Sequence, residues 1–180
     1  MTAWTTSTLS SNSTTSPNGK RREIIIDQLR QWGVDYRMQK YATGVNLYVD
    51  LGDTNKRIGI SSHFDRVEES PGANDNASAI AVCLQIIESY LASPDPRWGL
   101  RVLFFDEEET GLQGSVAYIR QFGVSDLSGL LNMELVGMGD RFALWPLAAG
   151  DQGPLLKAFE HCAGRRRIPY LCSRPGKKIE

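Results

Sequence analysis

RVLFF at residues 101–105 is followed directly by DEEE at residues 106–109, and this junction decides the fold class. A short and nearly all-apolar run of this kind is typical of a strand that is covered on both faces of a sheet. The four acidic residues follow at the point where the strand stops. The junction therefore predicts a buried sheet with charged side chains at one of its edges.

Helical and strand patterns alternate on both sides of this junction. The order strand, helix, strand in the second half of the chain predicts βαβ units with parallel strands. A Thr43-Gly44 turn between two alternating segments predicts an antiparallel hairpin at one edge. We therefore expect a three-layer α/β/α sandwich with a mixed, mostly parallel sheet. The expected helices are residues 24–32, 77–92, 112–122 and 154–163, and the expected strands are residues 36–41, 45–50, 57–62, 101–105, 130–136 and 141–145.

The composition is that of a globular protein. The chain has 180 residues, with 20 Lys+Arg against 21 Asp+Glu, so its formal net charge is -1. A charge near zero argues against a nucleic-acid binder, and no apolar run approaches the roughly 20 residues that span a membrane. The three cysteines follow no disulfide pattern and suggest a reducing compartment.

The first 18 residues differ from the rest of the chain. Ser and Thr dominate them, and no charged residue precedes Lys20. We interpret residues 1–18 as a disordered arm and residues 19–180 as one α/β domain. Because the arm has neither a basic start nor an apolar centre, it does not resemble a secretory signal, and we expect a cytoplasmic protein.

Chemically useful side chains fall where the expected strands end. His63 and Asp65 follow one strand, and Glu134 lies near the end of another. Asp75 opens the helix that follows the first of these strands, and the acids at 106–109 follow the third. In an open α/β sheet these positions share the carboxyl edge, where ligands bind.

Each of these residues also has a purely structural interpretation. His63 could be a satisfied polar residue at a strand end, and residues 106–109 could be a solvated loop. Asp75 or Asn76 could cap the helix that follows. Glu134 lies in an apolar segment, where an unpaired carboxylate is costly and needs a cation. Their convergence at one edge favours a site.

One imidazole together with several carboxylates suits a divalent cation. Zinc fits such a set with an open position for water, while manganese or cobalt stay open because these ligands discriminate weakly. Several carboxylates also suit two metals about 3.5–4 Å apart with a bridging acid. One glutamate of residues 106–109 could then stay free as a general base.

Four motifs, taken in order, resemble those of one enzyme family. They are HFD at residues 63–65, PGANDNAS at 71–78, FDEEETGLQGS at 105–115 and NMELVG at 132–137. The set is similar to that of the co-catalytic zinc aminopeptidases, which include aminopeptidases S and Y and the glutaminyl cyclases. The resemblance covers roughly residues 20–165 and implies a zinc peptidase-like fold.

The resemblance implies which residues would bind metal. His63 and Glu134 would bind a first zinc, and Glu109 would bind a second. Asp75 would bridge the two ions. The family also has a cis peptide bond after the bridging aspartate, which here is the bond between Asp75 and Asn76.

The resemblance further implies the roles of two other acids and the substrate. Glu108 would be the general base that takes a proton from water and passes it to the leaving amine. Asp65 would orient the His63 ring through a hydrogen bond. The substrate would be a peptide whose free α-amino group is held by acidic side chains.

The chain departs from the family pattern after Glu134. The family's last zinc ligand is a second histidine further along, and the sequence ends at Glu180 before such a motif. His161 is a poor substitute, because it falls off the apolar stripe of its expected helix. We therefore expect about one bound zinc in place of two, impaired activity, and self-association through a strand edge left uncovered.

A zinc-dependent aminopeptidase is the leading hypothesis, and two alternatives stay open. One is a glutaminyl cyclase-like aminoacyltransferase, against which the Asp75-Asn76 pair and the lack of a secretory signal argue. The other is a non-catalytic, truncated member of the family that binds a metal or a partner. The missing second histidine is the feature that favours it.

Overall fold

The computed structural model describes residues 17–52, 55–146 and 153–173. These residues divide into two compact units, one up to Gly137 and one from Met138 onward, which are described separately. Residues 1–16 of the expected disordered arm lie outside the described residues. Its last two residues, Pro17 and Asn18, begin a helix.

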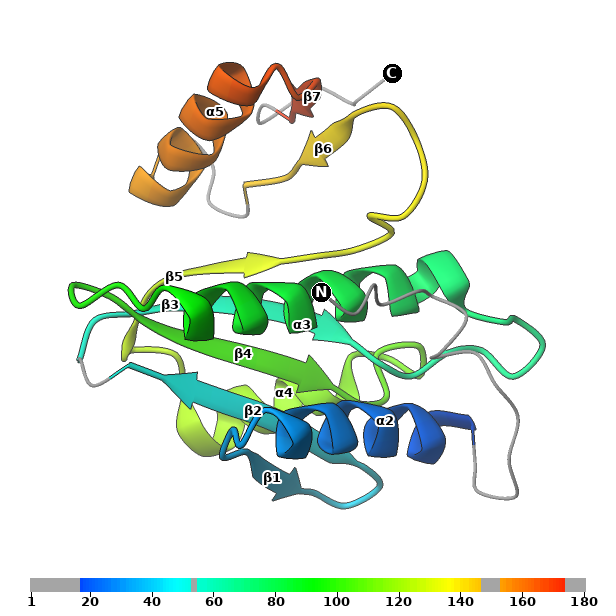
Figure 1. Cartoon of the computed structure of the whole chain (residues 1–180). Helices are drawn as coiled ribbons and strands as arrows, with labels where there is room; N and C mark the ends of the chain where they lie inside the picture. The colour runs from blue at the N-terminus through cyan, green and yellow to red at the C-terminus, as the bar shows by residue number, and fades with distance from the viewer. Residues whose placement is uncertain (1–16, 53–54, 147–152, 174–180) are drawn as a thin grey trace. The chain divides into compact units, whose positions relative to one another are not determined.

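The middle layer of the first unit is a five-stranded sheet (Figure 1). Its strands are β1 (Arg37–Lys40), β2 (Val45–Leu51), β3 (Arg57–His63), β4 (Gly99–Phe105) and β5 (Leu127–Asn132). Their order in the sheet is β1-β2-β4-β3-β5. β1 and β2 form the predicted antiparallel hairpin at one edge, and β2 is also antiparallel to β4. β3 is parallel to both β4 and β5, so the sheet is mixed, as expected.

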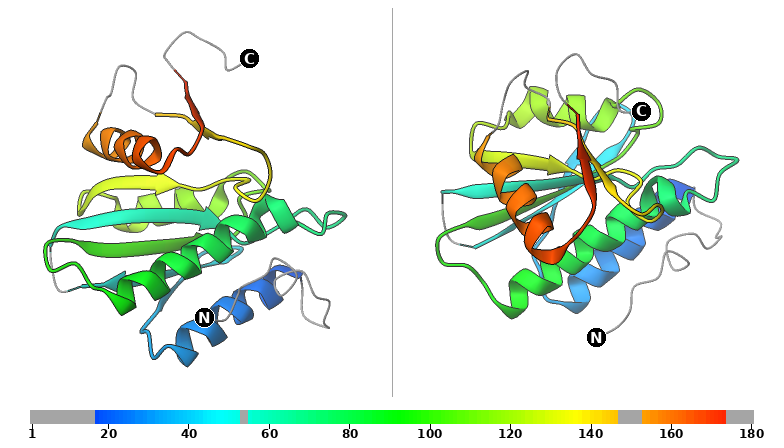
Figure 2. Two further views of the ribbon diagram at one scale, coloured as in Figure 1. Left: turned by 45° about the horizontal axis from the view of Figure 1, so that its top comes forward. Right: turned by 90° about the horizontal axis from the view of Figure 1, so that it is seen from above.

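Helices cover both faces of this sheet (Figure 2). They are α2 (Pro17–Gln31), α3 (Ser78–Ala92) and α4 (Gln113–Phe122). α2 and α3 lie on one face, and α4 lies on the other. The three-layer α/β/α sandwich is therefore confirmed.

Alternation along the strands builds a core on each face. Leu47 and Val49 of β2 belong to the larger core, which includes the apolar stripes of α2 and α3. Tyr48, between them, packs on the opposite side with Leu103 of β4 and Tyr118 of α4. β4 contributes to both cores and is buried along almost its whole length, which confirms the strand covered on both faces.

β5 differs from the buried strand expected at residues 130–136. It begins and ends earlier, and its residues alternate between half-buried and exposed. Leu130 is 43% exposed. The reason is its position, because β5 ends the sheet order, whereas β4 lies in the middle of it.

The segment after β5 is held by one backbone bond to β3, from the Met133 N–H to the Ser61 carbonyl oxygen (2.8 Å), and by the side chain of Asn76. The Asn76 amide donates to the carbonyl oxygen of Met133 (3.0 Å), and the Leu135 N–H donates to Asn76 Oδ1 (3.2 Å). Leu135 has a left-handed φ of 52°. Glu134, which lies between Met133 and Leu135, is therefore in a loop beyond β5 and not inside the strand.

The second unit is small. β6 (Phe142–Leu144) pairs in parallel with β7 (Tyr170–Cys172), and α5 (Pro154–Arg166) lies between them in the sequence. The expected strand at 141–145 and helix at 154–163 are confirmed, and β7 was not predicted. His161 is exposed on α5, as its position off the apolar stripe indicated.

Candidate metal centre

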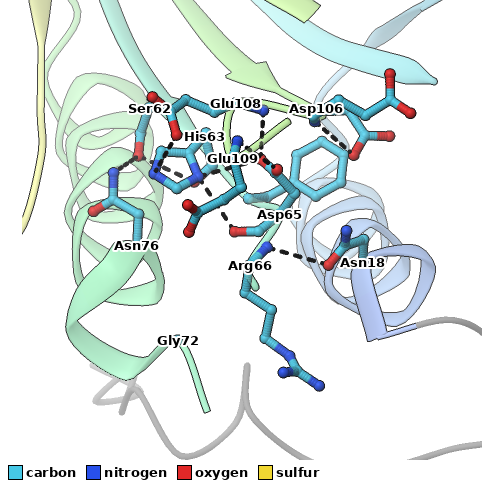
Figure 3. A network of polar contacts seen from close by, with 12 residues as sticks. Asn18, Ser62, His63, Asp65, Arg66, Gly72, Asn76, Asp106, Glu108 and Glu109 are labelled. Atoms are coloured by element: carbon cyan, nitrogen blue, oxygen red, sulfur yellow. Dashed lines mark hydrogen bonds and ion pairs between the residues drawn. The ribbon is translucent and has the colours of Figure 1, made fainter. Parts of the chain in front are cut away.

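The predicted site residues meet at the carboxyl edge of the sheet. His63 is the last residue of β3, and Glu108 and Glu109 follow the end of β4. Glu134 follows β5, and Asp75 lies in the turn before α3. Figure 3 shows His63, Glu108 and Glu109 gathered in one polar network. The ends of three neighbouring strands and the turn before α3 thus bring these side chains together.

His63 is the centre of this network and is 3% exposed. Its Nε2 atom lies 3.0 Å from Glu134 Oε1, 3.1 Å from Asp75 Oδ1 and 3.9 Å from Glu108 Oε2. Burial lowers the pKa of His63, but hydrogen bonds to Asp65 and Glu134 outweigh it and raise the pKa to about 10. The surrounding acids therefore stabilise positive charge at this point.

Asp65 holds both the histidine and the acidic loop in place. Its Oδ1 accepts hydrogen bonds from His63 Nδ1 (3.2 Å) and the Glu108 N–H (3.0 Å). Its Oδ2 accepts from the Glu109 N–H (3.0 Å). Burial raises the pKa of Asp65, but these hydrogen bonds outweigh it and lower the pKa. The contact with His63 was expected, whereas the contacts with the acidic loop were not.

The four consecutive acids divide into two pairs with different surroundings. Glu107 has a left-handed φ of 54° and accepts a hydrogen bond from the Thr43 hydroxyl (2.5 Å) in the β1–β2 turn. The carboxylate of Asp106 accepts hydrogen bonds from backbone N–H groups, including that of Glu107 (3.1 Å). Glu108 and Glu109 lie on the His63 side, and burial raises the pKa of both. The loop thus places only its second pair in the cluster.

The turn that carries Asp75, Ala73–Ala77, is kinked, because the φ and ψ angles of Asp75 (-110°, 93°) and Asn76 (-131°, 33°) are not helical. The bond between Asp75 and Asn76 is cis, as the resemblance implied. No side chain caps α3, so the capping interpretation of these residues is wrong. The fully buried Asn76 amide donates instead to Ser62 Oγ (3.0 Å) and to the Met133 carbonyl (3.0 Å). The turn is therefore joined to β3 and to the segment after β5.

The donor set fits a divalent cation. One ligand atom from each of His63, Asp75 and Glu109 lies within 4.8 Å of the other two. Among the described residues, the buried Glu109 Oε1 atom accepts no hydrogen bond, and the buried Asp75 Oδ1 atom has an ion-pair contact with His63 Nε2 (3.1 Å) in place of one. A buried carboxylate oxygen without a partner is costly. Nitrogen and carboxylate ligands together suit zinc.

The part that two buried polar residues play in holding this site was not predicted from the sequence. One is Asn76, which was considered as a helix cap and as part of the motif with Asp75, but not for its own hydrogen bonds. The other is Arg21, whose side chain bonds to the loop after β3. A signal for Arg21 was available, because it lies four residues before Ile25 and eight before Leu29, both completely buried. An arginine in line with a buried stripe needs polar partners.

The chain is similar to known peptidases. The sequence pattern of peptidase family M28 matches residues 46–169. The chain is 32% identical over 108 residues to a vacuolar membrane protease of Candida glabrata, a match that covers 58% of this chain and 11% of that protein. It is 38% identical over 96 residues to endoplasmic reticulum metallopeptidase 1 of Rattus norvegicus, a match that covers 52% of this chain and 10% of that protein. The matches span only about a tenth of these relatives.

A solved structure is similar as well. It is an aminopeptidase from Aneurinibacillus sp. strain AM-1, with a TM-score of 0.63 and 27% sequence identity. The similarity covers 72% of this chain and 34% of that one. The expected resemblance to zinc aminopeptidases is therefore confirmed in both sequence and fold.

The comparisons overturn the expected cytoplasmic location. Both relatives are named for an organelle, one for the vacuolar membrane and one for the endoplasmic reticulum. An unpatterned set of cysteines and a polar amino-terminal segment were too weak a basis for assigning a compartment. Across the described ranges, no helix combines the length and the apolar character needed to cross a membrane.

Proposed function

The chain belongs to peptidase family M28, a family of zinc peptidases, and on that premise we propose that it is an aminopeptidase. It would release amino-terminal residues from peptides. The observation that carries this proposal is the cluster of His63, Asp75, Glu109 and Glu134, with Glu108 beside it, in which the buried Glu109 Oε1 atom accepts no hydrogen bond from the described residues.

His63, Asp75 and Glu134 would hold one zinc ion. Three protein ligands with one open position are the usual arrangement of a catalytic zinc site. Asp75 and Glu109 would be the only two ligands for a second ion among the described residues, so we propose about one tightly bound zinc per chain. When bound, zinc supplies Lewis acidity, which polarises a carbonyl oxygen and lowers the pKa of water.

Glu108 is the proposed general base. Its side chain is 35% exposed, and its Oε2 lies 3.9 Å from His63 Nε2, so it reaches both the cluster and the solvent. Burial raises the pKa of Glu108, His63 lowers it, and the carboxylates of the cluster raise it further, for a net rise. A raised pKa suits a carboxylate that takes a proton from the attacking water and delivers it to the leaving amine.

The acidic character of the cluster supports a substrate with a free amino terminus. Five carboxylates lie near His63, and those of Glu108 and Glu109 have raised pKa values. An α-ammonium group would interact favourably with such a surplus of negative charge. A peptide with a blocked amino terminus lacks that interaction, and so we propose exopeptidase specificity.

Aminoacyl 4-nitroanilides with a free or an acetylated amino group test the proposal. The zinc-loaded chain should hydrolyse the free form, lose activity with a chelator, and regain it with added zinc. Equal hydrolysis of the acetylated form would contradict exopeptidase specificity. Conversion of an amino-terminal glutaminyl peptide to its pyroglutamyl form would favour the cyclase, and inactivity with zinc bound would favour a non-catalytic protein.

We also propose that the chain self-associates through β5. β5 ends the sheet order, and Leu130 on it is well exposed. An exposed strand edge with apolar side chains favours pairing with another chain. Sedimentation velocity should show a concentration-dependent dimer that Leu130→Lys weakens, and a monomer at every concentration would contradict this proposal.

A further inference from the structure

Arg21 is a buried arginine near the start of α2 and is 2% exposed. Its guanidinium donates to four backbone carbonyl oxygens of one loop. Nη1 donates to the oxygens of Phe64 (3.1 Å) and Asp65 (3.4 Å). Nη2 donates to the oxygens of Pro71 (2.8 Å) and Gly72 (2.7 Å). The rigid fork of donors in a guanidinium makes such a multiple contact possible.

These four oxygens lie at the two ends of the loop that joins two predicted ligands. The loop leaves β3 directly after His63 and ends at Gly72, where the turn that carries Asp75 begins. The side chain of Arg21, from α2, therefore hydrogen-bonds to both ends of the loop that joins His63 to the turn with Asp75.

Gly72 shows how closely the guanidinium approaches the backbone. Its φ is +58°, and a Cβ atom there would lie 2.5 Å from Arg21 Nη2 and 2.7 Å from the Asp75 carbonyl oxygen. A side chain at this position would displace one of the two. The contact thus depends on a bare backbone at the end of the loop.

Arg21 also brings a positive charge close to the acidic cluster. Burial lowers its pKa to about 10, and the neighbouring Arg66 lowers it as well. The carboxylates of Asp65, Asp75 and Glu109 act in the opposite direction. The guanidinium therefore stays charged at neutral pH and partly balances the carboxylates before a metal binds.

We infer that Arg21 is a positioning residue for the metal centre, because it keeps His63 and Asp75 at a fixed separation. The inference rests on the proposed function of this cluster as a zinc site. Without the guanidinium, the loop ends could separate, and metal binding would have to order them at a cost in affinity. Residues that support metal ligands typically contribute 10–100-fold to affinity.

Zinc affinity, measured by competition with a chromogenic chelator, tests this inference on the full chain. Arg21→Gln should weaken zinc binding by about 10–100-fold. Arg21→Lys should also weaken it at least tenfold, because an ammonium has three donors and cannot span four oxygens. Arg30→Gln is the matched control on the same helix, because the exposed Arg30 guanidinium donates to Asp27 and Tyr36, away from the cluster. It should change zinc affinity less than twofold.

The thermal midpoint of the metal-free protein separates positioning from general stabilisation. A purely structural role would lower that midpoint and leave zinc affinity unchanged, which would overturn the inference. Arg21→Lys with wild-type affinity would overturn it too, since charge alone would then suffice. If Arg21→Gln does not fold, the zinc affinity of Arg21→Lys, which keeps the positive charge, tests the inference instead. If the wild-type chain binds no zinc, both the proposed function and this inference are refuted. If the wild type binds zinc and the Arg21 variants bind it equally well, only the positioning role of Arg21 is refuted.

Discussion

Asp65→Asn is a sharp test of the candidate centre, because it keeps the shape of the side chain and changes its hydrogen bonding. In the wild type, the two carboxylate oxygens accept three N–H groups, from His63, Glu108 and Glu109. An asparagine has one oxygen and one NH₂ group. In either orientation of the asparagine amide, the NH₂ group faces at least one of these N–H donors, which then has no acceptor.

The expected loss of stability follows from these contacts. Hydrogen bonds to charged groups contribute about 1.5–3 kcal/mol, and a buried donor left without a partner costs about 1–3 kcal/mol. Asp65 is 1% exposed, so water cannot replace the lost acceptor. We expect the free energy of unfolding to fall by about 2–4 kcal/mol. Zinc affinity should fall by about 10–100-fold, because the His63 ring loses its carboxylate partner and keeps the Asp65 carbonyl oxygen (3.2 Å).

Denaturant unfolding of the metal-free chain, followed by tryptophan fluorescence, gives the first quantity, and chelator competition gives the second. Asp35→Asn is a suitable control, because Asp35 is exposed and lies outside the cluster. A loss below about 1 kcal/mol together with unchanged zinc affinity would refute the reasoning, since one ordinary hydrogen bond would already account for that much. Asp65 would then hold neither the histidine nor the acidic loop.

Three further predictions concern other groups. Glu108→Gln should lower turnover by about 10²–10⁴-fold and keep zinc binding, as expected for a general base; loss of zinc would contradict this role. Asp50→Asn should lower the free energy of unfolding by about 2–4 kcal/mol, because it weakens the contacts of Asp50 with Nε and Nη2 of the buried Arg101 (2.6 and 2.9 Å). The exposed Asp35→Asn control should leave the unfolding midpoint unchanged. Because the pKa of Asp65 is lowered in the folded chain, its stabilisation is present above its ordinary pKa of 3.8 and is lost as pH falls below that value. The stability difference between wild type and Asp65→Asn should therefore shrink in acid, and a constant difference would contradict the assignment.

Local patterns in the sequence predicted the elements and the edge at which the site lies. Apolar periodicity is a property of neighbouring residues, so it locates the ends of β3 and β4 without knowledge of the fold. His63 and Glu108 follow from those ends, because parallel strands present their carboxyl ends at one edge. The prediction was weaker for β5, whose apolar run continued past Asn132, where the strand ends.

Only the tertiary structure decided how the site is held together. Asn76 looked like a helix cap from its neighbours, yet its amide bonds to Ser62 and Met133. The Arg21 guanidinium binds carbonyl oxygens between 43 and 51 residues away in the sequence. The physical reason is that burial can be inferred from local periodicity, whereas the partner of a buried polar group depends on which distant backbone passes within about 3 Å of it. The sequence by itself therefore determined where the ligands gather, and the folded chain determined which side chains keep them in place.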